Sequence, residues 1–239
     1  MKKYYLVFIL LFLTMASYSQ DSRIKMNEKS IVKDSSGFVY PASIWGPLMF
    51  KGDVIIKPVD PKNRKTEFLL TKLNEAQKNE FLSKMPKPEE SLYFRTGKKL
   101  ALFKTTDIND RKINLKDEKG KIIVLNFWFI DCPPCRMEIP DLNQLVEEYK
   151  GNDSVLFIGV ALDPKPDIKD FLETMPFNYT LIHDGKSIAT EYGIRAFPTH
   201  VIIDKEGKIY FHTSGLAVNT VFWLKKSINE LLSSGVVKN

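Results

Sequence analysis

The sequence predicts an α/β fold in which a central sheet is flanked by helices. Residues 121–130 and 154–162 are continuous apolar runs rich in β-branched residues, as expected for strands buried on both faces. Segments with apolar residues at helical spacing follow each run. Strands that alternate with helices in this way are typical of a layered α/β domain.

The remaining elements of this domain can be predicted in order from about residue 97. Apolar residues at helical spacing predict a helix over 136–150 that ends at Gly151. The segment 199–213 is typical of a hairpin, with Gly207 supplying a positive φ at its turn. The other predicted elements are a helix at 165–175, a strand at 179–184, a short helix at 187–193 and a closing amphipathic helix at 218–232.

Residues 20–96 have a different pattern. The stretches 38–50 and 53–60 are short apolar runs interrupted by proline, which predicts short strands and turns. Helix-forming residues dominate 71–85, and 86–91 is expected to be a linker. This region contains no catalytic motif, and the sequence assigns it no role.

The first 19 residues are expected to be a signal peptide. Two lysines precede an apolar run over 4–13, and small and polar residues follow up to the expected cleavage between Ser19 and Gln20. A membrane anchor is the competing interpretation, but the run is shorter than the ~20 residues that a spanning helix needs. We therefore expect an exported soluble protein, periplasmic or otherwise extracytoplasmic, with no stable membrane anchor after cleavage.

Composition and charge narrow the class of protein further. An apolar fraction of 44% is enough for a substantial core. The formal net charge is +6, but the basic residues are interspersed with acidic ones and form no stripe, so we expect no nucleic-acid partner. The expected organisation is a signal peptide at 1–19, an N-terminal region at 20–96 and the α/β domain at 97–239.

Cys132 and Cys135 are the only cysteines of the chain, and two prolines separate them. A bridge between them would close a very small loop, so it would remove little conformational entropy from the unfolded chain. The pair is therefore a poor structural staple. It is well suited to redox chemistry instead.

The position of Cys132 favours its ionised form. Cys132 falls where a strand meets a helix, and free N–H groups and the helix dipole stabilise a thiolate at a helix N-terminus. We expect Cys132 to be the accessible nucleophile and Cys135, one turn further along, to be the less exposed resolving thiol. Pro133 and Pro134 suit a first helical turn but lack N–H donors, which predicts a weakly stabilised thiolate and a reducing pair.

Other uses of a C-x-x-C pair fit less well. A zinc site needs four ligands, and the three histidines, His183, His200 and His212, are far away in the sequence. Haem attachment needs a histidine where Arg136 stands. A cysteine peroxidase would not need the pair. We expect no cofactor and no metal. The histidines are expected to be structural, with their hydrogen bonds satisfied, and a catalytic role is the alternative for His200, which follows Thr199 near the site.

The active-site segment "VLNFWFIDCPPCRMEIPDL" resembles that of the TlpA/ResA family of exported thiol:disulfide oxidoreductases. The similarity extends over about residues 97–236 and includes "AFPT" and "VIIDKEGKI" beyond the cysteines. It implies a thioredoxin-like fold, with Pro198 as a cis-proline that faces the cysteine pair. It also implies a membrane thiol reductase as electron donor and, in some relatives, a role in cytochrome c biogenesis.

The resemblance suggests further site residues. Glu138, three residues after Cys135, corresponds to a glutamate near the cysteines in the family and could shuttle protons, although it could also simply favour the helix N-terminus. Asn126 stands where cytoplasmic thioredoxins have a buried aspartate. Asp131 departs from the family, which often has an aromatic residue there. The expected substrate-binding residues are Phe197, Pro198, Pro133, Pro134 and Trp128, with core packing as the alternative for Phe197 and Trp128.

The sequence therefore predicts a reductase that exchanges the Cys132–Cys135 dithiol with disulfides of extracytoplasmic proteins. A thiol oxidase or isomerase would use the same chemistry. A redox-gated binding protein is the alternative from another class, in which residues 20–96 recognise a partner and the cysteines act as a sensor.

Overall fold

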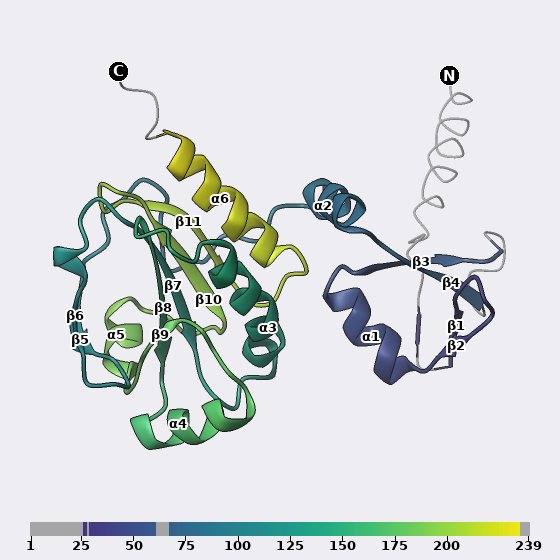
Figure 1. Cartoon of the computed structure of the whole chain (residues 1–239), viewed down its shortest axis with the longest axis horizontal. Helices are drawn as coiled ribbons and strands as arrows, with labels where there is room; N and C mark the ends of the chain where they lie inside the picture. Colours follow the sequence, from purple (N-terminus) through teal and green to yellow (C-terminus); the bar gives the residue numbers. More distant parts are fainter. Residues whose placement is uncertain (1–25, 28, 61–66, 235–239) are drawn as a thin grey trace, which may run out of the picture. The chain divides into compact units, whose positions relative to one another are not determined.

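The computed structural model describes residues 26–27, 29–60 and 67–234, which form two compact units (Figure 1). One unit contains the residues up to 49 and Val54–Lys72, and the other contains Phe50–Asp53 and the chain from Leu73 onward. The expected signal peptide lies outside the described residues. Within the described part of the chain, no helix is long and apolar enough to cross a membrane.

The second unit is built on a five-stranded sheet with the order β11-β10-β7-β8-β9. Strands β7 and β8 are parallel, as are β8 and β9, whereas β10 is antiparallel to both β7 and β11. The strands are β7 (Ile122–Trp128), β8 (Val155–Ala161), β9 (Thr180–Ile182), β10 (Thr199–Ile203) and β11 (Ile209–Ser214). Every residue of β7 is buried, as predicted for a central strand.

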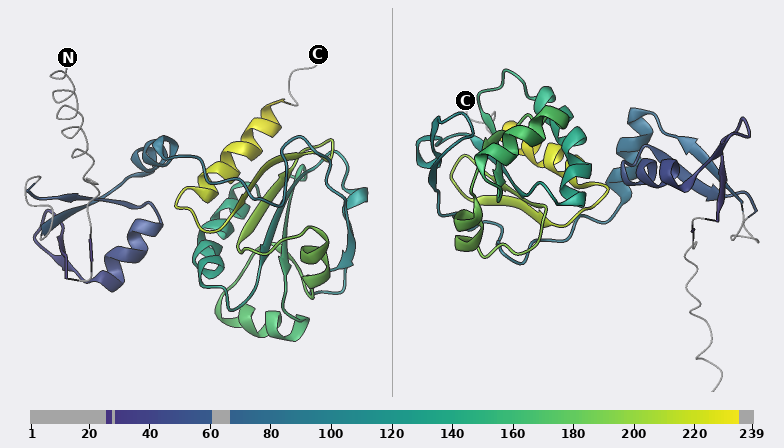
Figure 2. Two further views of the ribbon diagram at one scale, coloured as in Figure 1. Left: turned by 180° about the vertical axis from the view of Figure 1, so that it is seen from behind. Right: turned by 90° about the horizontal axis from the view of Figure 1, so that it is seen from below.

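Helices cover both faces of this sheet, which confirms the predicted α/β fold class (Figures 1 and 2). Helices α3 and α6 lie side by side on one face, and α5 and a small hairpin lie on the other. The helices are α3 (Pro133–Glu148), α4 (Lys165–Thr174), α5 (Lys186–Glu191) and α6 (Thr220–Ser234). The hairpin consists of β5 (Lys104–Thr106) and β6 (Lys112–Asn114), and the short 3₁₀ helix Leu115–Asp117 follows it.

Turn residues fix two of the connections as the sequence predicts. Gly207 has a φ of 81° in the turn between β10 and β11, and Gly151 has a φ of 80° just after α3 ends. Glycine adopts this left-handed conformation without the steric penalty that other residues meet. The β10–β11 hairpin brings His200 next to β7, where its register partner is Asn126.

The first unit is a four-stranded sheet with the order β2-β1-β4-β3, covered on one face by α1 (Ala42–Phe50). Strands β2 (Val39–Tyr40) and β3 (Val54–Pro58) lie within the predicted apolar runs, whereas β1 (Ile31–Lys33) and β4 (Glu67–Lys72) were not predicted. The expectation of strands and turns at 42–50 is wrong. Trp45 and Leu48 on α1 pack against the apolar cluster of the sheet, and this burial favours a helix although Pro47 lacks an N–H donor.

The predicted helix in 71–85 is present as α2 (Glu75–Lys84), with a capping box at its start. The Asn74 side chain accepts a hydrogen bond from the Gln77 N–H, and the Gln77 side chain accepts one from the Asn74 N–H. The segment 86–91 is not the expected linker, because it belongs to the second unit and is hydrogen-bonded within it. The Asn219 amide donates to the Pro86 carbonyl, and the Thr213 hydroxyl donates to the Glu89 carbonyl.

Candidate active site

The two cysteines lie at the start of α3, directly after the central strand β7. Cys132 is the N-cap residue, and Pro133 and Pro134 occupy the first two helical positions. Proline is tolerated there because the first N–H groups of a helix have no intrahelical acceptor. The predicted placement of Cys132 at a strand-to-helix turn is therefore confirmed.

Cys132 and Cys135 form a disulfide, with their Cα atoms 5.3 Å apart. The Cys135 N–H points at Sγ of Cys132, with the nitrogen 3.3 Å from the sulfur. N–H groups of the second and third helical residues usually bond to the N-cap side chain. Because Pro134 is the second helical residue and has no N–H, Sγ of Cys132 has one main-chain donor from this turn instead of two.

The prediction that Cys132 is accessible is wrong for this disulfide form. Cys132 and Cys135 are each 2% exposed, and both belong to the apolar core on the α3 side of the sheet. The half-buried side chains of Phe129 and Phe197 pack against the same core, with their ring centroids 5.4 Å apart. Both cysteines of the disulfide therefore lie in an apolar environment.

The segment before β10 contains the expected cis-proline. The Phe197–Pro198 peptide bond is cis, and the Pro198 carbonyl accepts a hydrogen bond from the Gly215 N–H at 2.8 Å. Pro198 itself is buried and Phe197 is half-buried. Within the described chain, the Phe197 N–H and carbonyl make no hydrogen bond.

The other expected substrate-binding residues differ in their accessibility. Pro133 is exposed and Pro134 is half-buried, so both present surface beside the disulfide. Trp128 is only 1% exposed, and its ring packs between those of Phe171 and Phe177. This position favours core packing over substrate contact for Trp128, which corrects its assignment as a binding residue.

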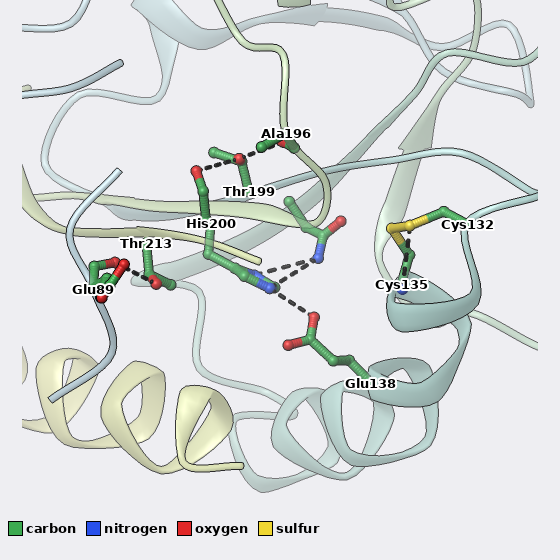
Figure 3. A network of polar contacts seen from close by, with 10 residues as sticks. Glu89, Cys132, Cys135, Glu138, Ala196, Thr199, His200 and Thr213 are labelled. Carbon is green, nitrogen blue, oxygen red and sulfur yellow. Dashed lines mark hydrogen bonds and ion pairs between the residues drawn. A yellow bond between two sulfur atoms is a disulfide. The ribbon is translucent and has the colours of Figure 1, made fainter. Parts of the chain in front are cut away.

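Glu138 lies on α3 three residues after Cys135 and is 4% exposed. Its carboxylate points toward His200 of β10, with Oε2 of Glu138 2.8 Å from Nε2 of the imidazole (Figure 3). Nδ1 of the same ring lies 3.3 Å from Nδ2 of Asn126. Burial and then the negative charge of Glu138 raise the pKa of Tyr179, whose hydroxyl is also buried. The structure thus brings the polar side chains of Glu138, His200 and Asn126 together, and the sequence did not predict this cluster.

His200 is the residue that sequence reasoning undervalued. The side chain is completely buried and is bonded on both ring nitrogens. The sequence signal for a role at the site was the position of His200, two residues after Pro198. The pairing of His200 with Glu138 could not be predicted in the same way, because it depends on the order of the strands in the sheet. His212 also differs from the expectation of a satisfied structural histidine, because neither of its ring nitrogens has a hydrogen-bond partner among the described residues.

Two acidic residues, Asp163 and Asp131, lie beside the segment that leads into Cys132. The Asp163 carboxylate accepts a hydrogen bond from the Ile130 N–H at 2.8 Å and so ties the loop after β8 to the loop before Cys132. Burial raises the pKa of Asp163, and the charge of Asp131 adds to this shift. Asp131 is exposed, and the Arg136 guanidinium lies 5.8 Å from the centre of the Phe171 ring. The described residues include no group of three His, Cys, Asp or Glu side chains that could hold a metal ion.

Comparisons with known proteins agree with a dithiol site on this fold. The AhpC/TSA family matches residues 96–212. The thiol-disulfide oxidoreductase ResA of Halalkalibacterium halodurans is 31% identical over 129 residues, which are 53% of this chain and 73% of the relative. ResA of Bacillus thuringiensis subsp. konkukian is 35% identical over 120 residues, which cover 50% of this chain and 69% of the relative.

A solved structure extends the likeness to the whole fold of the domain. The structure assigned as the thiol:disulfide interchange protein DsbE of Chlorobium tepidum matches with a TM-score of 0.53 and 28% identity. The match covers 58% of this chain and 99% of that one. These relatives share the thioredoxin fold, and this chain has its Cys132–Cys135 disulfide at the start of α3. The chain therefore belongs to the ResA-like thiol-disulfide oxidoreductases of thioredoxin fold.

Proposed function

We propose that the protein is exported and that its Cys132–Cys135 dithiol reduces disulfides in extracytoplasmic proteins. The observation that carries this proposal is the pairing of the two sulfurs at the N-terminus of α3, in the core against which Phe197 packs. The catalytic domain is taken to comprise residues 97–239. Support for export comes from the pattern of residues 1–19 alone.

The proposed reaction has two exchange steps. The Cys132 thiolate attacks one sulfur of the client disulfide, so a Cys132–client disulfide forms and the other client sulfur leaves as a thiolate. Cys135 then loses its proton, and its thiolate attacks Sγ of Cys132. The Cys132–Cys135 disulfide forms, and the second client sulfur leaves with the electron pair. Two electrons pass from the protein to the client.

Glu138 is the proposed proton acceptor for Cys135. The two residues are three apart on α3 and share a helix face. Oε1 of Glu138 is buried and has no hydrogen-bond partner among the described residues, so it can accept a proton from the thiol. The proton then passes to the departing client thiolate or to solvent.

The direction of electron flow follows from the scarcity of donors around Cys132. A thiolate with few N–H donors gains little stability, so the reduced form is a stronger reductant. We expect a reduction potential closer to the ~ −270 mV of thioredoxin than to the ~ −120 mV of DsbA. Equilibration with glutathione and dithiothreitol buffers would measure it, and a DsbA-like value would contradict the proposed direction.

Client capture tests the function itself. A Cys135→Ala variant cannot resolve the mixed disulfide, so it should retain clients on Cys132 that mass spectrometry can identify after non-reducing electrophoresis. The matched control, Cys132→Ala, should retain none. Equal retention by both variants would contradict the assignment of Cys132 as the nucleophile.

After each turnover the disulfide must be reduced again, and a membrane thiol reductase is the proposed donor of the two electrons. Fractionation of the source cells tests the location. The mature chain should begin at Gln20 and be released with the extracytoplasmic proteins. A chain that retains residues 1–19 in the cytoplasm would contradict export.

A redox-gated binding protein is the second candidate, and one feature of the first unit favours it. This unit has its own apolar core and also exposes Phe38, Val39 and Ile44 on its surface. In this proposal residues 20–96 bind a partner and the cysteines sense its redox state. A double variant, Cys132→Ala with Cys135→Ala, would then keep its partner, whereas the reductase would lose all turnover.

A further inference from the structure

We propose that His200 is a positioning residue that holds the Glu138 carboxylate in place as the proton acceptor for Cys135. The inference rests on the role proposed above for Glu138. It assigns a function to a histidine that lies 62 residues away in sequence, on strand β10.

The geometry gives His200 two partners. Nε2 lies 2.8 Å from Oε2 of Glu138 (Figure 3). Nδ2 of Asn126 lies 3.3 Å from Nδ1 and 3.5 Å from Nε2 of the same ring. His200 is 0% exposed, Asn126 is 2% exposed and Glu138 is 4% exposed. All three side chains are therefore shielded from bulk water.

Glu138 determines which ring nitrogen must carry a proton. A carboxylate oxygen is an acceptor only, so Nε2 of His200 donates its proton to Oε2. In the neutral imidazole Nδ1 is then unprotonated, and it is the ring nitrogen nearer to Nδ2 of Asn126. This arrangement gives the carboxylate a donor inside an apolar core.

The hydrogen bond leaves the other carboxylate oxygen available. A buried carboxylate is strongly disfavoured unless a donor compensates for its lost hydration, and His200 supplies that donor to Oε2. Oε1 has no hydrogen-bond partner in the described part of the structure. Since Glu138 follows Cys135 by three residues on α3, Oε1 is the oxygen that can take the thiol proton.

The proton transfer is balanced without a change at His200. The Cys135 S–H bond breaks, its proton moves to Oε1, and the electron pair stays on sulfur as the attacking thiolate. The imidazole keeps its Nε2 proton throughout. The other ionisable groups shown to interact with Glu138 are His200, at Oε2, and Tyr179, whose burial keeps its hydroxyl protonated.

The test measures resolution of a mixed disulfide in the full chain. Cys132 is first joined to a peptide thiol at low pH, where Cys135 stays protonated and does not attack the mixed disulfide. After a jump to a final pH between 5 and 9, stopped-flow detection follows peptide release. His200→Leu removes the donor and should slow release about tenfold or more near neutral pH, because hydrogen bonds to charged groups are among the stronger ones. His200→Gln keeps an N–H donor and should restore most of the rate.

His212→Leu is the matched control. His212 lies on the adjacent strand, is 2% exposed and packs against Phe94 on the other face of the sheet. Its substitution removes a buried imidazole without touching Glu138 and should leave the pH profile of release unchanged. His200→Asn, whose shorter amide ends before the carboxylate, repeats the test if the leucine variant does not fold.

Combining variants separates this inference from the proposal on which it rests. Glu138→Gln should slow release, and adding His200→Leu to it should slow release no further. A slow Glu138→Gln variant beside a normal His200→Leu variant would overturn the role of His200 alone. Additive effects of the two substitutions would also overturn it. A normal rate in Glu138→Gln would overturn the proton-acceptor role, and the inference with it.

Discussion

Single residues around Cys132 set how readily its sulfur ionises. Pro134 removes the N–H of the second helical residue, so the Cys135 N–H is left as the main-chain donor to Sγ of Cys132. Asp131 adds a negative charge next to the nucleophile in the sequence. Both features oppose a thiolate, and both are consistent with a reducing pair.

Restoring the missing donor should therefore change the chemistry. Pro134→Ala supplies an N–H at the second helical position, which should stabilise the thiolate and make the potential more oxidising by about 30 mV for each tenfold change in the exchange constant. Pro133→Ala is the matched control, since the first helical N–H does not reach the N-cap side chain. A shift of the same size in both variants would contradict this explanation.

His212 makes stability depend on pH. The side chain is 2% exposed, and burial lowers its pKa, although Glu90 opposes the shift. Below the ordinary value of about 6.5 the unfolded chain therefore binds more protons than the folded one. The free energy of unfolding should fall as the pH is lowered from 7.5 to 5.5.

Urea unfolding at the two pH values measures this effect. His212→Phe keeps an aromatic ring against Phe94 but cannot be protonated, so it should lose part of the decrease. The carboxylates of the chain contribute equally to both proteins. Equal decreases in the wild type and the variant would mean that His212 does not titrate on unfolding.

At the scale of elements, a hydrogen bond joins the loop after β8 to the loop that precedes Cys132. The Asp163 carboxylate in the loop after β8 accepts from the Ile130 N–H at 2.8 Å, two residues before Cys132. Asp163→Ala should leave this N–H without its acceptor and cost about 1–3 kcal/mol of stability. It should also slow disulfide exchange, because the loop before the nucleophile loses its anchor.

Asp163→Asn is the control for this prediction, since its amide oxygen can still accept from Ile130. Thermal unfolding and insulin reduction should place the asparagine variant close to the wild type and the alanine variant below both. Equal losses in the two variants would indicate that the charge of Asp163 matters more than the hydrogen bond.

Most elements of the second unit could be predicted, but the β5–β6 hairpin was not, and the order of the strands in the sheet could not be. Continuous apolar runs and helical periodicity are local properties, and they located β7, β8 and α3. The pairing of β10 with β7 is a long-range property, and it alone brings His200 opposite Asn126 and within reach of Glu138. The cysteines were found from spacing, whereas the buried polar group needed the fold.

At the scale of the whole molecule, the chain consists of two units with separate cores. The first unit was the harder one to predict. Its helix α1 contains a proline and follows one, so local signals favoured turns over the helix that packing selects. The sequence pattern changes at about residue 97, whereas the second unit takes in the chain from Leu73 onward, so residues 73–96 of the predicted N-terminal region belong to the second unit.

Separate cores predict separate effects of core substitutions. Phe68 is 0% exposed in the first unit, and Phe68→Ala should cost about 3–5 kcal/mol there. Calorimetry should show one thermal transition move while the other stays, and insulin reduction should be retained. Phe211→Ala, in the core of the second unit, should move the other transition. A single transition that moves in both variants would contradict independent cores.

The shielding of the sulfur pair also affects which molecules can exchange electrons with it. A small thiol dissolved in the medium would have to reach two cysteines that are each 2% exposed, whereas a docked protein makes contacts of its own around them. The oxidised protein should therefore exchange more slowly with small thiols than with docked proteins. Over short times its redox state would then reflect the partners it has met more than the average potential of the compartment.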